Sequence, residues 1–268
     1  ASSTTAWVGT VWAYADIARM ILQQDFSAAL TALQASTQRQ DLEQPVPWLL
    51  LSDLAAYEGH TEAALAHIRH GLERFPDNPR LHAQRARLLL FADRAVDAAE
   101  AADTAIVADL SSYDAWLARA DIARREGDAA TALAAYDLAI SLKPDDDQAW
   151  FGRGAAFGER EYVRQARADL SRALALNPAG TGYQGELGTL ETFANETAQA
   201  QAAFRAALEN NPADFVALTG LGMLELKLGH PQQALEAFLK AGVMEPRYAR
   251  VHVYTAVAYY QMGNIKQA

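Results

Sequence analysis

The hydrophobic positions of this chain follow a helical spacing, and they come in pairs of segments. In segment 114–126 the apolar positions do not alternate as they would in a strand. They are Trp116, Leu117, Ala120, Ile122 and Ala123. A second amphipathic segment follows over 129–143, and Pro144 then disfavours further helix because its ring blocks the preceding turn. The pattern predicts two helices joined by a short turn.

A residue suited to a left-handed turn separates the two segments, and its position recurs every 34 residues. Glycine closes a helix in this conformation without steric cost, and Asn and Asp also tolerate it. The residues at this position are Gly59, Asp93, Gly127, Glu161, Asn195, Gly229 and Gly263. Glu161 is the exception, because glutamate does not readily tolerate the left-handed conformation.

Small residues keep the same 34-residue period at three further positions. The first series is Ala64, Ala98, Ala132, Ala166, Ala200, Ala234 and Ala268. Twelve residues before each alanine stands another small residue: Ser52, Ala86, Ala120, Gly154, Gly188, Gly222 or Ala256. Seven residues after six of them come Gly71, Ala105, Ala139, Ala173, Ala207 and Ala241. Small residues let helix backbones approach closely, so a strict period predicts a stacked all-α repeat array.

The runs DAWLARADIARREGDAATALAAYDLAISLKP and NPADFVALTGLGMLELKLGHPQQALEAFLKAGVMEP resemble the tetratricopeptide repeat, a helix–turn–helix unit. The resemblance implies an α-solenoid of about seven to eight units over 1–268, coiled as a right-handed superhelix. Its repeats would span about 45–78, 79–112, 113–146, 147–180, 181–214 and 215–248. A degenerate repeat at about 10–44 would precede them, and a truncated one over 249–268 would follow.

The two ends of the sequence suggest a piece of a longer protein. The chain begins without methionine, and Ala268 falls early in the second helix of the last repeat. Since a solenoid end normally carries a polar capping helix, we expect further segments to exist.

The resemblance also implies a concave groove lined by the first helices, which binds peptides or other proteins. Its lining can be read at fixed offsets in each repeat. The predicted groove residues are Leu49, Asp53, Tyr57, Arg80, Arg87, Phe91, Asp121, Arg124, Arg125, Phe151, Phe193, Met223 and Leu226. Their N-terminal members carry mixed charge and their C-terminal members are more apolar, which favours a ligand helix or an extended apolar segment.

Arginine forms a second series at the 34-residue period, Arg85, Arg119 and Arg153. One interpretation is a row of cations that faces an acidic ligand. The favoured interpretation is structural: the arginine stem packs between helices and its head meets a carboxylate, with Asp169 as the candidate partner of Arg153.

Glycines gather in the segment GTGYQGELG at the start of one first helix (180–188). Interior helix glycines cost about 0.5–1 kcal/mol each against alanine, so a reason for them is needed. A hinge that lets the array flex and close packing against the previous unit are equally supported. The glycines of FGRGAAFG (151–158) are interpreted as helix-packing positions, because they follow no strand and complete no phosphate-loop motif.

Composition narrows the chemistry further. The formal net charge of −10 argues against duplex nucleic acid as a partner, since phosphate contacts need a basic face. The absence of cysteine excludes disulfides and thiolate metal sites. His67, His70 and His82 are interpreted as a solvated helix face rather than a metal site. No apolar run approaches the roughly 18 residues of a membrane span, so no direct membrane insertion is expected. No catalytic constellation is found, and we predict no enzyme activity, no cofactor and no metal.

The sequence thus favours a non-enzymatic scaffold that binds a protein or peptide in its groove. Two alternatives remain open. One is a bacterial envelope component for assembly or polysaccharide export, which the Ala-, Gln- and Asp-rich, Cys-free composition resembles. The other is the regulatory arm of a larger enzyme. The compartment stays open between a bacterial periplasm or envelope and the cytoplasm.

Overall fold

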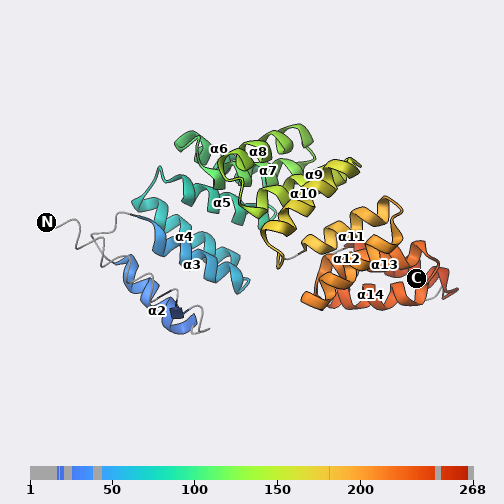
Figure 1. Ribbon diagram of the computed structural model, residues 1–268. Helices are drawn as coiled ribbons and strands as arrows, with labels where there is room; N and C mark the ends of the chain where they lie inside the picture. Colours follow the sequence, from blue (N-terminus) through green and yellow to red (C-terminus); the bar gives the residue numbers. More distant parts are fainter. Residues whose placement is uncertain are drawn as a thin grey trace. The chain divides into compact units, whose positions relative to one another are not determined.

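The structure is a computed structural model of the 268-residue chain (Figure 1). It describes residues 17, 19, 20, 26–38, 44–180, 182–244 and 249–264, all in helices or short connections and none in a strand. Its helices are α2 (Phe26–Thr37), α3 (Val46–Tyr57), α4 (Thr61–Arg74), α5 (Pro79–Phe91), α6 (Ala95–Ala108), α7 (Tyr113–Glu126), α8 (Ala129–Leu142), α9 (Asp147–Glu159), α10 (Val163–Leu176), α11 (Tyr183–Phe193), α12 (Thr197–Asn210), α13 (Phe215–Lys227), α14 (Pro231–Met244) and α15 (Ala249–Gln261). The all-α repeat fold is confirmed.

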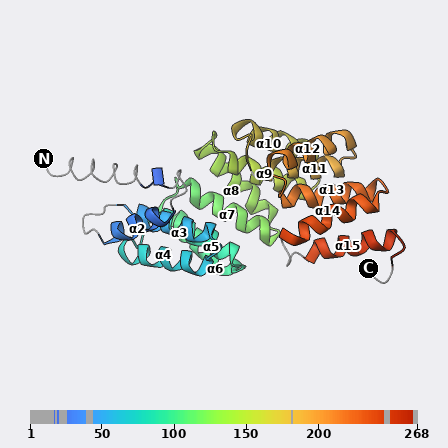
Figure 2. The same cartoon turned by 90° about the horizontal axis from the view of Figure 1, so that it is seen from below.

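The chain forms two compact units, residues 1–142 (unit 1) and 143–268 (unit 2). Unit 1 contains α2 and the helix pairs α3/α4, α5/α6 and α7/α8, and its first helices follow one another by direct contact (Figure 2). Unit 2 contains the pairs α9/α10, α11/α12 and α13/α14, followed by α15. These six pairs coincide with the six full repeats expected from the sequence. That all of 1–268 forms one continuous solenoid stays a prediction.

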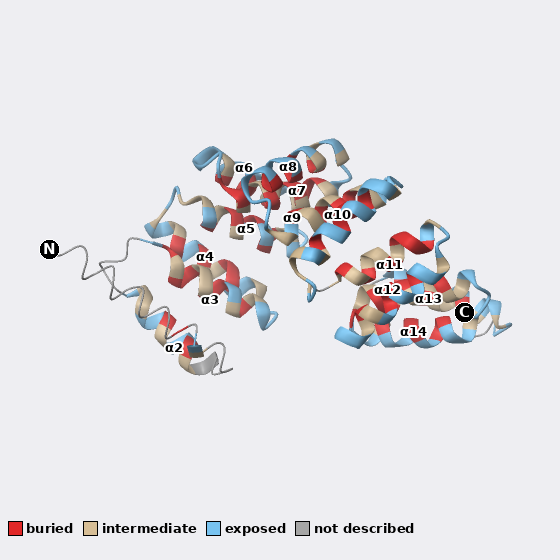
Figure 3. Ribbon diagram, in the orientation of Figure 1, coloured by how far each residue is buried: buried red, intermediate tan, exposed pale blue. Residues whose placement is uncertain are grey.

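The three series of small residues lie at helix contacts. The phased alanines from Ala64 to Ala234 are all fully buried, and Ala268 lies outside the described residues. The earlier series from Ser52 to Gly222 is buried as well, and only its last member, Ala256, is half-buried. Figure 3 shows the buried residues on the facing sides of paired helices, where they form the core of each unit.

Three glycines of the first helices face large side chains of the second helices. A Cβ added at Gly154 would lie 3.0 Å from Leu170, while one at Gly188 would lie 2.6 Å from the Phe204 ring. At Gly222 the distance to the ring of Phe238 would be only 2.4 Å. Real Cβ atoms do not approach a neighbour as closely as at Gly188 and Gly222, and the contact at Gly154 would be tight. The absence of a side chain therefore lets these helices meet.

All seven turn positions between paired helices adopt the left-handed conformation. Glycine occupies four of them, and Asp93, Glu161 and Asn195 have φ of 61°, 61° and 63°. The expectation that Glu161 would be an exception is wrong. The tight connection from α9 to α10 imposes the conformation on it, because its N–H bonds to the carbonyl of Gly158 and the N–H of Tyr162 bonds to that of Phe157.

The first helices begin at a capping side chain that also keeps the period. Asn78, Ser112, Asp146 and Asp214 each accept a hydrogen bond from a backbone N–H in the first turn of the helix that follows. Gly180 stands at the same position in the sixth repeat and offers no such acceptor. Helix α11 accordingly begins at Tyr183, two residues after the position that the period gives.

A ring N–H fixes the connection between successive repeats. Nε1 of Trp116 donates to the carbonyl of Leu110 at 2.9 Å, and Nε1 of Trp150 donates to that of Pro144 at 2.9 Å. Nε2 of His82 lies 2.6 Å from the carbonyl of Pro76. Pro76, Leu110 and Pro144 thus end their repeats and present the acceptor that holds the next first helix.

We predict that Glu161→Gly stabilises the protein by about 1 kcal/mol, since a left-handed residue with a Cβ costs about that much. Gly127→Ala, at the equivalent turn with φ of 80°, provides the matched control and should lower stability by a similar amount. Urea denaturation followed by circular dichroism measures both. A lower unfolding midpoint for Glu161→Gly would contradict the assigned turn.

Candidate binding surface

The first helices of unit 1 carry nine of the predicted groove residues. We call the surface formed by these positions on α3, α5 and α7 the first-helix face of unit 1. Its members are Leu49, Asp53, Tyr57, Arg80, Arg87, Phe91, Asp121, Arg124 and Arg125. Asp53, Arg87 and Asp121 share one position in their repeats, and Tyr57, Phe91 and Arg125 share another. Helix α5 contacts both α3 and α7, so residues at a shared position follow one another across the three helices.

Polar side chains connect α3 with α5 on this face. Oδ1 of Asp53 accepts a hydrogen bond of 2.6 Å from Nε2 of Gln84, and Oε1 of Gln84 accepts one of 3.4 Å from Arg87. Desolvation raises the pKa of the Asp53 carboxyl, while Arg87, the Gln84 bond and Arg80 act against the rise. The network joins Asp53 to Arg87 through a glutamine.

A second carboxylate lies on the other side of Arg87. The hydroxyl of Tyr136 on α8 donates to Oδ1 of Asp121 at 2.5 Å. Burial raises the pKa of Asp121, and the Tyr136 bond and the positive charges of Arg124 and Arg87 oppose that rise. Charges of alternating sign therefore run across α3, α5 and α7, and they largely compensate one another.

Arg125 caps the preceding first helix. It donates to the carbonyl of Leu90 at 2.6 Å and to Oδ1 of Asp93 at 3.0 Å, at the C-terminal end of α5. Lys227, at the same repeat position in unit 2, donates to the carbonyl of Thr192 at 2.6 Å. Sequence reasoning missed this role, although the period that relates 125 to 227 was a usable signal.

Aromatic residues occupy that repeat position in three other first helices. Tyr57, Phe91 and Phe193 are 81%, 74% and 65% exposed, at the C-terminal ends of α3, α5 and α11. Tyr57 and Phe91 belong to the first-helix face of unit 1, and Phe193 to the corresponding face of unit 2. Because these rings are exposed, the core does not require them. The cations at the same repeat position, by contrast, cap the end of a neighbouring helix.

The remaining predicted residues of unit 2 are more enclosed. Phe151 is half-buried and stacks on Tyr183 of α11, with ring centroids 4.3 Å apart. Met223 and Leu226 are half-buried against the core cluster around Phe238. Among the four residues predicted in this unit, Phe193 thus presents the largest exposed fraction.

The ring of Tyr183 is fixed by a hydrogen-bonded cluster of unit 2. The Tyr183 hydroxyl donates to Oδ2 of Asp147, which also accepts from Nδ2 of Asn177 at 3.0 Å. Burial acts to raise the pKa of Asp147, but these two bonds and a backbone N–H lower it below its usual value. Phe151 therefore rests on a ring whose position is set by α9 and α10.

The arginine series is structural at two of its three positions. Nε and Nη2 of Arg153 donate to both oxygens of Asp169, at 2.7 and 2.9 Å, so the predicted partner is confirmed. Nε of Arg119 lies 3.1 Å from Asp103 of α6. Arg85 is exposed and forms no ion pair in the part of the chain that the structure describes.

The glycine-rich start of α11 is a packing device. A Cβ on Gly185 would lie 2.9 Å from the backbone nitrogen of Ala217, and one on Gly220 would lie 2.5 Å from the Phe204 ring. Phe204 is thus enclosed by glycines of both α11 and α13. The close approach is to the following repeat rather than to the previous one, which corrects that part of the packing interpretation.

In the described ranges, no three His, Asp or Glu side chains lie close enough together to hold a metal ion. None of the described helices is both long and apolar enough to cross a membrane. Asn195 of the tripeptide Asn195–Glu196–Thr197 occupies the turn between α11 and α12.

Stacked helix pairs with an exposed first-helix face define an all-α repeat scaffold. Family models described as tetratricopeptide repeat match residues 113–156, and residues 186–242 and 219–268. The matched parts of the chain, residues 113–156 and 186–268, therefore consist of tetratricopeptide repeats. This repeat is generally a non-catalytic scaffold that mediates protein interactions.

Solved structures share the fold at low sequence identity. A tetratricopeptide repeat protein from Parabacteroides merdae is 14% identical with a TM-score of 0.69, over 92% of this chain and 97% of that one. The Cut9–Hcn1 hetero-tetramer of the APC/C gives 14% identity and a TM-score of 0.73, over 85% of this chain and 45% of that one. No curated protein sequence matches the chain.

A third similar structure bears on the class of ligand. A monomeric mutant of IFIT1, solved with m7Gppp-AAAA, is 13% identical with a TM-score of 0.69, over 94% of this chain and 65% of that one. The fold alone therefore does not exclude nucleic acid. The argument against duplex nucleic acid rests on net charge and stays a prediction.

We predict that Asp169→Ala lowers the unfolding free energy by about 3 kcal/mol, because it leaves the largely buried Arg153 guanidinium without its carboxylate. The double variant Arg153→Leu/Asp169→Ala should recover most of this loss, since Leu51, Leu187 and Leu221 occupy the position of Arg153 in other repeats. Chemical denaturation of the two variants measures the difference. A double variant no more stable than Asp169→Ala would contradict a purely structural role for Arg153.

Proposed function

We propose that this protein is a scaffold that holds a segment of a partner protein along its first-helix faces. The exposed rings of Tyr57 and Phe91 are the main contacts in unit 1, and Phe193 is the corresponding contact in unit 2. The repeat architecture supports the general role. The choice of residues is supported by their exposure and by their shared place in the repeat.

The observation that carries the proposal is the exposure of aromatic rings at one repeat position. Positions 57, 91 and 193 are related by the 34-residue period. The rings at these positions are exposed, so the core does not need them. At this position Arg125 and Lys227 instead cap a helix end. Exposed aromatic side chains are frequent anchors of protein interfaces because they bury a large area at a small entropy cost.

The polar row beside Tyr57 and Phe91 defines the segment further. Asp53, Arg87 and Asp121 alternate in sign, and the first two are already joined through Gln84. Because the positive and negative side chains of this row balance one another, the row does not select a strongly charged ligand. It suits the polar backbone and uncharged side chains of a segment whose apolar side chains contact the rings.

The groove residues Leu49, Arg80, Arg124, Phe151, Met223 and Leu226 remain part of the predicted lining. The envelope role and the enzyme-arm role also remain predictions from the sequence, and no contact in the described residues favours either over a general scaffold.

A phage-displayed library of short random peptides tests the proposal. We expect the protein to enrich peptides with aromatic or aliphatic side chains, and Tyr57→Asp/Phe91→Asp to weaken their binding about tenfold or more, because interface anchors are worth about 2 kcal/mol or more. Fluorescence polarisation with synthetic copies of the enriched peptides gives the dissociation constants.

Val96→Asp/Val107→Asp is the matched control. These two valines are 81% and 84% exposed on α6, so the control adds the same charges to an exposed apolar surface of a second helix. It should bind the enriched peptides like the unmodified chain. Equal loss in both double variants, or no loss in Tyr57→Asp/Phe91→Asp, would contradict the proposed face.

A further inference from the structure

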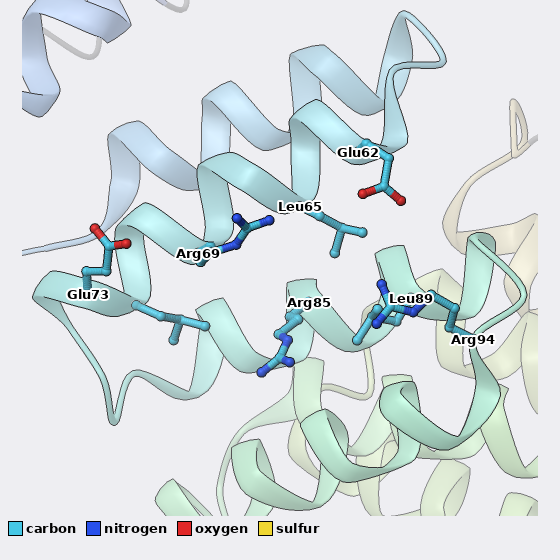
Figure 4. Close-up of a pocket in the computed structure, with 8 residues that line it drawn as sticks. Glu62, Leu65, Arg69, Glu73, Arg85, Leu89 and Arg94 are labelled. Carbon is cyan, nitrogen blue, oxygen red and sulfur yellow. The ribbon is translucent and has the colours of Figure 1, made fainter.

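The junction of α4 and α5 contains a cavity of about 460 Å³, which we call the α4–α5 pocket (Figure 4). The buried side chains of Leu65 and Leu89 form part of its wall. Arg69 reaches it from α4 and Arg85 from α5, and both are exposed. The pocket therefore combines apolar surface with two cations that come from opposite helices.

The two arginines depart from the pairing found at the next junction. Asp103 stands one repeat after Arg69, Arg119 stands one repeat after Arg85, and these two later residues form the ion pair of 3.1 Å. The repeat position that supplies a carboxylate between α6 and α7 thus supplies a second cation between α4 and α5. Neither Arg69 nor Arg85 has a hydrogen bond, ion pair or ring contact within the described residues.

Two other junctions pair an arginine with a carboxylate. In unit 2, Arg167 of α10 donates to both oxygens of Glu191 on α11, at 2.7 and 2.6 Å. Such bidentate pairs are strong because the planar guanidinium matches the two carboxylate oxygens. Arg69 and Arg85 therefore have the chemistry for a carboxylate, and the chain does not provide one.

The same cavity recurs four repeats later, between α12 and α13 of unit 2, with a volume of about 440 Å³. There Leu221 occupies the position of Arg85, and Glu225 occupies that of Leu89. Glu225 is bonded to Nδ1 of His230 at 2.8 Å. Arg205 occupies the position of Arg69 there, so the repeat produces the cavity and one of its arginines. The second arginine, Arg85, is what distinguishes the α4–α5 pocket.

Acidic residues limit how much negative charge the α4–α5 pocket accepts. Glu62 and Glu73 of α4 also line it, and Arg94 is already held by Asp97 through bonds of 2.6 and 2.9 Å. These carboxylates repel a polyanion such as a nucleic-acid backbone. They favour a ligand with a single carboxylate, which Arg69 or Arg85 can bind next to an apolar side chain on the leucines.

We propose that the α4–α5 pocket binds a protein partner through a segment that carries one carboxylate beside an apolar residue. This site is separate from the first-helix face, because it shares no residue with it. The proposal therefore does not depend on the aromatic contacts of Tyr57 and Phe91, and either site can fail without the other.

Two matched phage-displayed peptide libraries test the pocket, one with a fixed central glutamate and one with glutamine in its place. We expect the protein to enrich peptides from the glutamate library, with an apolar residue next to the glutamate. Arg69→Gln/Arg85→Leu should weaken binding of the enriched peptides about tenfold or more, since hydrogen bonds between charged groups are stronger than those between neutral groups. Leucine is the residue that this repeat position carries at Leu51, Leu187 and Leu221, so the fold should tolerate it.

Two control variants separate the pocket from general charge and from the aromatic contacts. Arg164→Gln/Arg250→Gln removes the same charge from exposed positions of unit 2 and should leave the affinity unchanged. Tyr57→Asp/Phe91→Asp should also leave it unchanged. Arg69→Lys/Arg85→Lys keeps the charge without the planar fork and should retain part of the binding, which guards against an effect of misfolding.

Four outcomes would overturn the proposal. The first is that the glutamate library gives no enrichment over the glutamine library. The second is that Arg69→Gln/Arg85→Leu binds the enriched peptides as tightly as the unmodified chain does. The third is that only Tyr57→Asp/Phe91→Asp loses binding. The fourth is a single-stranded RNA oligonucleotide that binds the chain and is released by the arginine variant, which would assign the pocket to nucleic acid.

Discussion

In unit 2 each helix pair depends on one contact, between a glycine of its first helix and the side chain that the second helix places against it. In unit 2 the contact pairs Gly188 with Phe204 and Gly222 with Phe238, at distances that leave no room for a Cβ. Because the glycine carries no side chain, the ring fills the space between the helices and fixes their separation. The spacing of the first helices of unit 2 therefore follows from these contacts.

Comparison of equivalent repeat positions distinguishes residues that hold the array together from residues that are available for binding. Arg125 and Lys227 cap helix ends, while Phe91 and Phe193 occupy that repeat position with their rings exposed. Arg119 is paired across its junction, while Arg85 is not paired within the described part of the chain. In a repeat protein, a position that carries a different residue from its structurally committed equivalents is a strong candidate for function, because the fold supplies an internal control.

Periodicity predicted most of the fold, because residues that repeat every 34 positions meet the same neighbours each time. It gave the helix pairs, the buried small residues and the turn positions. Residue preference was misleading at Glu161, because the tight connection imposes the left-handed conformation on a residue that does not favour it. Periodicity missed the late start of α11, although Gly180 at a capping position was a visible signal. The roles of Arg125 and of the Arg69/Arg85 pair depend on which helices adjoin in space. A single residue offset therefore did not reveal them.

A double-mutant cycle on Gly222 and Phe238 tests most directly whether size complementarity fixes the helix pair. Gly222→Ala should destabilise by about 1–3 kcal/mol, since its Cβ would overlap the ring. Phe238→Leu alone resembles the repeat that pairs Gly154 with Leu170. In Gly222→Ala/Phe238→Leu the smaller side chain should relieve part of the overlap. The account predicts that the double variant loses less unfolding free energy than the sum of the two single variants, by about 1 kcal/mol or more. The helix preference of alanine cancels in this comparison. Fully additive losses would contradict it.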